Sequence, residues 1–355
     1  MSFFKNGSED IARLIKLGIE NGTRRAVITC DWEITSAIRI PSDFTLILDN
    51  CHLKMADGTF DNMFVNEHHG TPEGNTIAGT DHNISIIGRG NVILDGGQYN
   101  GLSEKTSLKD GMPHISKNNL LLFTNVDGFQ IRNLSFHNQR WWACNFVYCA
   151  NGEITDIKFK ADDTCIDKNG NVYHGLSTEH YYDMYVKNSD GIDLRQGCHH
   201  ILIENIYGFT GDDTVALTAL NGTVEKMYAV EGLSSDLCYI KIKNVVSETL
   251  ASNVRLLCQG EARLHNVMVD GVEDISGQSN HLLTHGDSGV KVNDTRLYGS
   301  RPVTEDDMYN IVIKNVRSRA HYALSLAGKK IKNFSYENIV CFDGGGFIND
   351  LRELD

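Results

Sequence analysis

A short pattern of apolar and polar positions recurs along most of the chain. Each copy contains an apolar residue, a polar residue, an Asn or Asp and a second apolar residue, as in QIRNLSF around Asn133. Alternating apolar and polar residues between Gly, Asn and Asp turns are typical of short β-strands. The copies contain the following Asn or Asp residues: Asn133, Asp156, Asn205, Asn244, Asn266, Asn315 and Asn333.

The spacing of the copies is close to one repeat of a solenoid. Asn133 and Asp156 are 23 residues apart, Asn244 and Asn266 are 22 apart, and wider gaps elsewhere indicate insertions. Leucine-rich repeats have a similar length, but the sequence lacks their leucine frame and helical return segments. We therefore predict an all-β fold, a single-stranded right-handed parallel β-helix, in which coils bond at about 4.8 Å and the repeated Asn stack at one corner.

The whole chain, residues 1–355, is expected to form this one domain, because its four prolines and 33 glycines mark no linker. Residues 161–187 and 285–307 interrupt the repeat and are predicted to be loop insertions. The open end of a solenoid exposes strand edges that need cover. Residues 8–21 therefore predict a capping helix, in which Ser8 is the N-cap. The apolar face of this helix is expected to consist of Ile11, Leu14, Ile15 and Ile19.

Three carboxylates occur on two segments that lie one coil apart. NSDGIDL, residues 188–194, contains Asp190, and GDDTVAL, residues 211–217, contains Asp212 and Asp213. The 22 residues from Asp190 to Asp212 place the three side chains on adjacent rungs of one face. Neighbouring negative charges raise a carboxyl pKa, so one carboxyl can stay protonated near neutral pH. Asp residues also form simple turns, but the paired segments favour a functional site.

These segments resemble the signatures of the polygalacturonase-type glycoside hydrolases, which are Asn-Thr-Asp-Gly and Gly/Gln-Asp-Asp one coil apart. WWACNFVYC and NVILDGG resemble two further coils of that family, so the similarity extends over most of the chain. The resemblance implies a pectin lyase-like β-helix with Asp212 as the general acid. It also implies that Asp190 and Asp213 hold and deprotonate the attacking water and that Asn188 fixes the site. Inverting hydrolysis needs an acid and a base about 6.5 to 9.5 Å apart, which successive rungs can provide.

Two parts of the family pattern are missing. Residues 218–248 contain no His where a Gly-His-Gly coil is expected, and NVRLLCQG keeps Arg255 but has Leu257 in place of a Lys. The resemblance implies that the Arg and the Lys of this motif act, in the family, as a clamp on a uronate carboxylate. A guanidinium alone still binds a carboxylate well, so Arg255 remains a candidate for substrate binding.

Further candidates for substrate binding surround the acidic segments. His174 and His180 lie in the 161–187 insertion, although a surface His is more often structural. Trp141 and Trp142 either stack on a sugar or pack inside the protein, and the sequence favours neither. His199 and His200 are interpreted as packing or corner residues. Candidates for the wall of a cleft are Arg140, Arg296, Tyr298 and Arg301.

Composition bears on the partners of the protein. The formal charge of −13 gives no basic patch for nucleic acid, and no apolar run is long enough to span a bilayer. The N-terminus lacks a secretory signal, so we expect a cytoplasmic protein. Nine cysteines without CxxC spacing indicate reduced, buried thiols. No metal or other cofactor is expected, and the oligomeric state is left open.

The leading interpretation is a glycoside hydrolase that acts on an oligosaccharide or polysaccharide. We expect an inverting, exo-acting enzyme for uronic-acid-containing or related oligosaccharides. Two alternatives stay open. A catalytically altered carbohydrate-binding solenoid would explain the missing His and Lys, whereas a polysaccharide lyase or epimerase would need a base beside a uronate, which the scarcity of basic residues disfavours.

Overall fold

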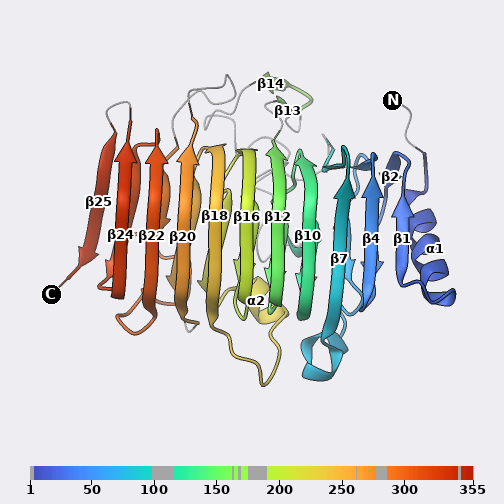
Figure 1. The fold of residues 1–355 in the computed structure, drawn as a ribbon, viewed down its shortest axis with the longest axis horizontal. Helices are drawn as coiled ribbons and strands as arrows, with labels where there is room; N and C mark the ends of the chain where they lie inside the picture. Colours follow the sequence, from blue (N-terminus) through green and yellow to red (C-terminus); the bar gives the residue numbers. More distant parts are fainter. Residues whose placement is uncertain are drawn as a thin grey trace.

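The computed structural model describes residues 4–97, 115–161, 164–166, 169–174, 190–260, 262–276, 286–342 and 345–354. Two long parallel sheets, of 13 and 10 strands, wind around one axis. The predicted right-handed parallel β-helix is confirmed. Figure 1 shows the rungs side by side, with the helix α1 at the N-terminal end.

Sheet 1, the larger sheet, has the following main strands in spatial order: β1 (Arg25–Ile28), β4 (Phe44–Asp49), β7 (Asp81–Arg89), β10 (Val126–His137), β12 (Ala150–Lys160), β16 (His199–Thr210), β18 (Leu237–Thr249), β20 (Leu264–Asp274), β22 (Met308–Ser318) and β24 (Lys332–Cys341). Three short strands complete it: β2 (Trp32–Ile34), β5 (His52–Met55) and β8 (Ile93–Asp95).

Sheet 2, which carries the acidic residues, consists of these strands: β3 (Ile38–Ile40), β6 (Phe64–Asn66), β9 (Asn119–Thr124), β11 (Trp142–Val147), β15 (Asp190–Arg195), β17 (Val215–Leu220), β19 (Ser252–Gln259), β21 (Ser288–Val292), β23 (Tyr322–Lys329) and β25 (Gly346–Glu353). The remaining elements are the antiparallel pair β13 (Thr164–Ile166) and β14 (Val172–His174), the α-helices α1 (Gly7–Glu20) and α2 (Thr223–Met227), and the 3-10 turns η1 (Glu73–Asn75), η2 (Ile77–Gly79) and η3 (Ile115–Lys117).

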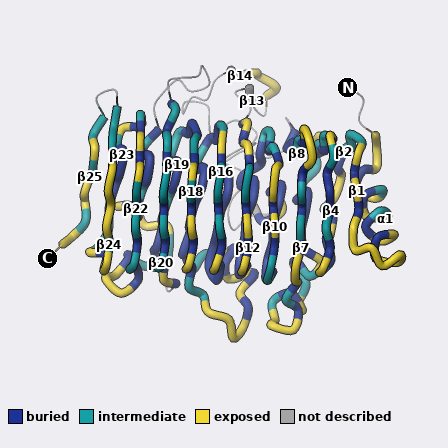
Figure 2. The backbone as a smooth tube through the Cα atoms, viewed as in Figure 1, coloured by how far each residue is buried: buried dark blue, intermediate teal, exposed yellow. Residues whose placement is uncertain are grey.

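The core consists of columns of apolar side chains that repeat from coil to coil. Ile131, Ile154, Ile203 and Ile242 are in register on four consecutive strands of sheet 1, and all four are fully buried. Figure 2 shows buried and exposed residues alternating along these strands. Burying one such side chain contributes about 1.5–3 kcal/mol, so the stacked columns are a main source of stability.

One part of the repeat is stacked as the sequence predicts. Asn205 and Asn244 lie on neighbouring strands with positive φ, and the amide of Asn244 donates to Oδ1 of Asn205 at 2.8 Å. The amide of Asn205 donates in turn to Oδ1 of Asp156 at 3.0 Å. Asn tolerates this left-handed backbone better than other residues with a side chain, so the ladder also bends each strand at the same place.

The Asn residues form two ladders, however, rather than the expected single one. Ile242 pairs with Val269 instead of Leu264, so Asn266 belongs to a different bend from that of Asn244. Asn266 accepts a hydrogen bond from the amide of Asn310 at 2.8 Å. Both bends require a residue with positive φ. Asn therefore recurs at two different positions along the strands of sheet 1.

Helix α1 covers the first coil, as predicted, through Ile11 and Ile15, which are buried against the core. The rest of its expected apolar face was partly wrong, because Ile19 is 40% exposed. Asn6, rather than Ser8, precedes the helix. Ser8 lies in the first turn, where Oγ donates to the carbonyl of Ser36 at 2.9 Å and accepts from its N–H at 3.1 Å. Ser8 thus fastens the helix to the first coil.

Three other expectations concern the less regular parts of the chain. The interpretation of 285–307 as a loop insertion was wrong in part, since β21 begins at Ser288 and is a rung of sheet 2. Eight cysteines whose side chains the structure describes are thiols, of which six are buried (Cys51, Cys144, Cys149, Cys198, Cys238 and Cys258) and two are partly exposed (Cys30 and Cys341). Among the described residues, no helix is long and apolar enough to cross a membrane.

The ladder that contains Asn205 can be tested by substitution. Asn205→Ala loses the amide hydrogen bonds. It also places an alanine in the left-handed backbone conformation, which alanine disfavours, so the total cost in the free energy of unfolding is about 2 kcal/mol. Asn205→Gly loses only the hydrogen bonds and is expected to cost about half as much. Urea unfolding measures both. Equal destabilisation by the two variants would contradict a conformational role for Asn205.

Candidate active site

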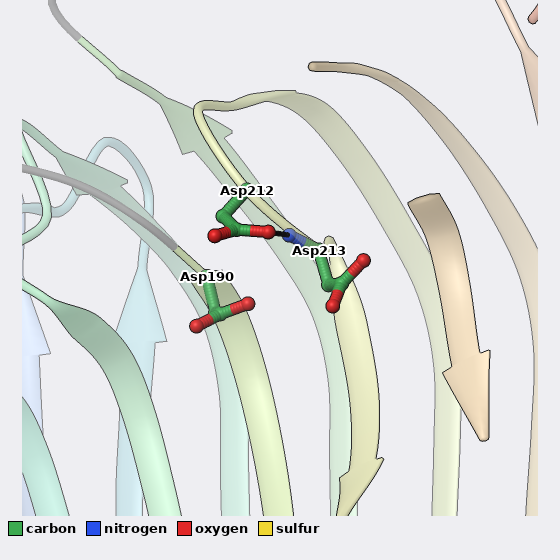
Figure 3. A group of neighbouring side chains, drawn as sticks. All are labelled: Asp190, Asp212 and Asp213. Carbon is green, nitrogen blue, oxygen red and sulfur yellow. Dashed lines mark hydrogen bonds between the residues drawn. The ribbon is translucent and has the colours of Figure 1, made fainter. Parts of the chain in front are cut away.

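The three predicted carboxylates meet where two middle strands of sheet 2 begin. Asp190 is the first residue of β15, and Asp212 and Asp213 lie just before the adjacent strand β17, separated from it by Thr214. The N–H of Gly191 donates to the carbonyl of Asp213 at 2.9 Å, which ties the two strand starts together. One carboxyl oxygen from each Asp lies within 4.8 Å of the others. Figure 3 shows Asp190 on one rung facing Asp212 and Asp213 on the next.

Asp213 is held by groups that favour its ionised form. Its Oδ1 accepts the N–H of Ser252 at 3.0 Å, and its Oδ2 lies 3.4 Å from Nη1 of Arg255. Burial raises the pKa of Asp213, while the positive charges of Arg255 and Lys291 act in the opposite direction. Asp213 is therefore the member of the group with the most support as an anion.

Asp212 and Asp190 have surroundings that favour a bound proton. Burial, followed by the charge of Asp213, raises the pKa of Asp212 to about 7. Burial, followed by the charges of Asp193 and Asp212, raises the pKa of Asp190 well above its usual range. Asp212 is fixed by the N–H of Asp213, which donates to its Oδ1 at 3.0 Å. The group can thus retain a proton near neutral pH.

The nearest oxygens of the three carboxylates lie closer together than the roughly 6.5–9.5 Å that separates whole carboxyl groups in inverting enzymes. Their nearest oxygens lie within 4.8 Å of one another. A water molecule that donates to two oxygens at about 2.8 Å each spans roughly 4.4 Å between them. Oxygens of Asp190 and Asp213 that lie within 4.8 Å of each other are therefore close enough to share a single water.

Sheet 2 also provides two cations on the rungs after the acidic group. Arg255, between the core residues Val254 and Leu256, points to the outer face of the sheet, and Lys291 is in register with it on β21. The sequence predicted Arg255 but missed Lys291, because β21 was assigned to a loop. The alternation in SGVKV is the signal that could have revealed this strand.

A buried ion-pair network lies on the opposite side of the acidic group and was also missed. Nη1 of Arg195 is 2.8 Å from Oε1 of Glu225 in α2, and Nη2 is 3.3 Å from Oδ1 of Asp193. The guanidinium carbon lies 3.9 Å from the centre of the Trp142 ring. Burial raises the pKa of Asp193 to about 8, despite the charge of Arg195. The network joins α2 to the strand that begins with Asp190.

Trp141 and Trp142 are packing residues in this structure. They are only 6% and 5% exposed, and they belong to an apolar cluster with Val224 and Tyr228 from the α2 segment. Leu122, which lies between two core residues on β9, joins this cluster from the outer face of sheet 2. Of the two interpretations that the sequence left open, packing therefore agrees with the structure, and sugar stacking by these rings does not.

The other candidates have mixed outcomes. Arg140 is buried and donates to the carbonyls of Gly96 and Thr59, so its assignment to a cleft wall was wrong. His200 stacks on Tyr239 on sheet 1, as expected of a corner residue. Asn188 and His180 lie outside the described residues, and of His174 only the backbone, at the end of β14, is described.

The three cleft-wall candidates of residues 285–307 differ in where they lie relative to Arg255. The ring of Tyr298 lies 4.8 Å from the guanidinium carbon of Arg255 and 5.1 Å from that of Arg296. Arg301 forms an ion pair with Asp307 at 2.6 Å. Tyr298 thus lies beside Arg255, whereas Arg301 holds the fold of its own segment.

Comparison with known proteins gives a family match and a set of similar folds. Residues 30–234 match the family described as glycosyl hydrolases family 28. No curated protein matches the chain. Among solved structures, a mutant tailspike protein of E. coli bacteriophage HK620 in complex with a pentasaccharide is similar, with a TM-score of 0.60 and 14% identity. The match covers 99% of this chain and 62% of the tailspike chain.

A hyperthermoactive exopolygalacturonase from Thermotoga maritima is also similar in structure. Its TM-score is 0.52 at 14% identity, and the match covers 96% of this chain and 85% of the other. Structural similarity at such low sequence identity shows the fold alone, and the activity must be argued from the residues of the site.

The Arg195–Glu225 ion pair predicts a large effect on stability. Glu225→Gln leaves the buried Arg195 without its closest counter-charge, and breaking a buried pair in this way is expected to cost about 3 kcal/mol. Glu231→Gln, on the exposed part of the same segment, is the matched control and should change the free energy of unfolding by less than about 0.5 kcal/mol. Similar urea midpoints for the two variants would contradict the anchoring role of Glu225.

Proposed function

The chain belongs to family 28 of the glycosyl hydrolases, and we propose that it is an inverting, exo-acting enzyme for uronic-acid-containing or related oligosaccharides. The observation that carries the proposal is the acidic group, in which Asp190, Asp212 and Asp213 each place an oxygen within 4.8 Å of the others. Such a group combines a carboxyl that can give a proton with carboxylates that can take one.

In the proposed reaction Asp212 donates its proton to the glycosidic oxygen as the bond to the sugar carbon breaks. Asp190 and Asp213 orient one water between them, and Asp213 accepts its proton as the water attacks that carbon. The N–H of Ser252 and the guanidinium of Arg255 favour the ionised form of Asp213, which suits it to act as the base. The products are a sugar with a hydroxyl group on its anomeric carbon and the leaving group as a free alcohol. Because the water attacks from the face opposite the leaving group, the configuration of the anomeric carbon is inverted.

Exo action is supported by what covers sheet 2 on one side of the acidic group. Val224 and Tyr228 pack over the outer face of the sheet with Leu122 and Trp142, on the rungs that precede Asp190. An oligosaccharide lying along this face therefore meets a wall on the N-terminal side of the acidic group. A wall beside the catalytic residues limits how far a chain end can enter, as exo action requires. A cytoplasmic location stays a prediction from the sequence.

The test is to incubate the protein with a panel of uronic and neutral oligosaccharides and to follow the first product by proton NMR. We expect single sugars or short end fragments with inverted anomeric configuration. Asp212→Asn should lower kcat/KM by a factor of about 100 or more, because it removes the proton donor. Asp306→Asn, an exposed Asp, is the control.

Four outcomes would contradict the proposal. Retention of configuration would exclude direct attack by a shared water, and mid-chain fragments would exclude exo action. Unsaturated products would show that the enzyme is a lyase and not a hydrolase. Binding without turnover across the panel, in wild type and Asp212→Asn alike, would favour a carbohydrate-binding solenoid.

The pH dependence follows from the raised pKa values. Asp212 must be protonated to act, so kcat/KM should fall by about tenfold per pH unit above its pKa of about 7. Asp213 must be ionised, so activity should also fall as the pH drops through its raised pKa. Because Arg255 lowers both pKa values, Arg255→Gln should move both limbs of the profile to higher pH. A basic limb that does not move would argue against Asp212 as the acid.

A further inference from the structure

The cations beside the acidic group are already paired with carboxylates of the protein. Arg255 contacts Asp213 at 3.4 Å and Asp294 at 3.2 Å. Lys291 contacts Asp287 at 2.8 Å and Asp294 at 3.0 Å. Arg255 and Lys291 thus contact three carboxylates between them, and the exposed Arg296 contacts one of these, Asp294, at 3.5 Å. Both cations are therefore already paired with carboxylates of the protein before any substrate binds.

Asp294 has the geometry of a built-in anion between the two cations. Its Oδ2 is the atom that both Arg255 and Lys291 contact. Its Oδ1 accepts the N–H of Arg296 at 3.0 Å, which fixes the side chain. Only 5% of the side chain is exposed. Burial opposes its ionisation, but the N–H of Arg296 and the charge of Lys291 outweigh burial and lower the pKa of Asp294 to about 2. Asp294 is therefore ionised throughout the working range of the enzyme.

A carboxylate on a bound sugar would have to compete with this arrangement. It would need to displace Asp294 from both cations, or else lie next to Asp213, Asp287 and Asp294 while Arg255 and Lys291 remain paired with these carboxylates. Like charges brought together at a partly buried site are strongly unfavourable. A hydroxymethyl or methyl group at the same place carries no such cost.

We propose that Asp294 is a specificity-determining residue that excludes a carboxylate next to the acidic group, so that the sugar cleaved is neutral. This inference rests on the proposed function and narrows its substrate: the oligosaccharide can contain uronic acid elsewhere, but the residue at the bond that breaks is a neutral hexose or deoxyhexose. Arg255 and Lys291 then serve to hold Asp213 and Asp294 in place rather than to bind a substrate carboxylate.

The test compares pairs of oligosaccharides that differ only at C6. Oligogalacturonides and oligoglucuronides are used as such and after reduction of their carboxylates to hydroxymethyl groups. We expect wild-type enzyme to cleave a reduced oligosaccharide with kcat/KM at least about tenfold above that of its uronate partner. Asp294→Asn should shrink this ratio by about tenfold, mainly through faster cleavage of the uronate. Asp350→Asn, which removes an Asp–Arg pair on the last rung, should leave the ratio unchanged.

The outcomes separate this inference from the proposed function. Preference of the wild type for the uronate member would overturn the inference and leave the glycosidase intact, a result that does not depend on any variant folding. An unchanged ratio in a folded Asp294→Asn, shown by an unchanged melting transition, would overturn the role of Asp294. Absence of hydrolysis with every pair would count against the proposed function and, with it, the inference.

Discussion

Parallel register forces each residue of a coil to lie about 4.8 Å from its counterpart on the next coil. In most of this chain the rule stacks like upon like, as in the isoleucine columns of the core and the Asn ladders of the bends. At the starts of β15 and β17 the same rule brings Asp190 level with Asp213 and leaves Asp212 beside them. The site is thus a place where stacking, which stabilises the rest of the fold, becomes repulsive.

The surroundings of the acidic group show how this repulsion is reduced. One carboxylate, Asp213, is paired with Arg255 and the N–H of Ser252. The pKa values of Asp190 and Asp212 are raised, and within the described part of the chain neither has such a close cation contact, so part of the negative charge is removed by protonation near neutral pH. Both solutions are useful in acid/base chemistry, since they leave an anion and a proton donor within one small volume. The pairing of β15 with β17 keeps the backbones of Asp190 and Asp213 on adjacent strands.

The parts of the fold and site that could be predicted from sequence are those with a local signal. The alternation of apolar residues predicted the coils, and the offset of one coil from Asp190 to Asp212 predicted their meeting. Register between distant coils could not be obtained in this way. Asn266 satisfied the same pattern as Asn244 although the strands pair at a different offset, because two bends share the need for positive φ.

The cations and the α2 anchor were missed for a related reason. Lys291 follows Arg255 by one coil that includes a long insertion, so no fixed spacing marks it. The partnership of Arg195 with Glu225 depends on how the segment after β17 folds back over sheet 2, and neither residue belongs to a repeat. Trp141 and Trp142 carry apolar side chains that suit a cleft or a core equally, and only the position of α2 decides between them.

The central claim is that crowding by register keeps a carboxyl of this group protonated near neutral pH. It is tested most directly by carbon-13 NMR of the protein labelled at its Asp carboxyl carbons, titrated from about pH 4 to pH 9. The account predicts at least one carboxyl resonance that titrates near pH 7 and is lost in Asp212→Asn. If every Asp carboxyl titrates below about pH 5, as unperturbed Asp does, the account is contradicted.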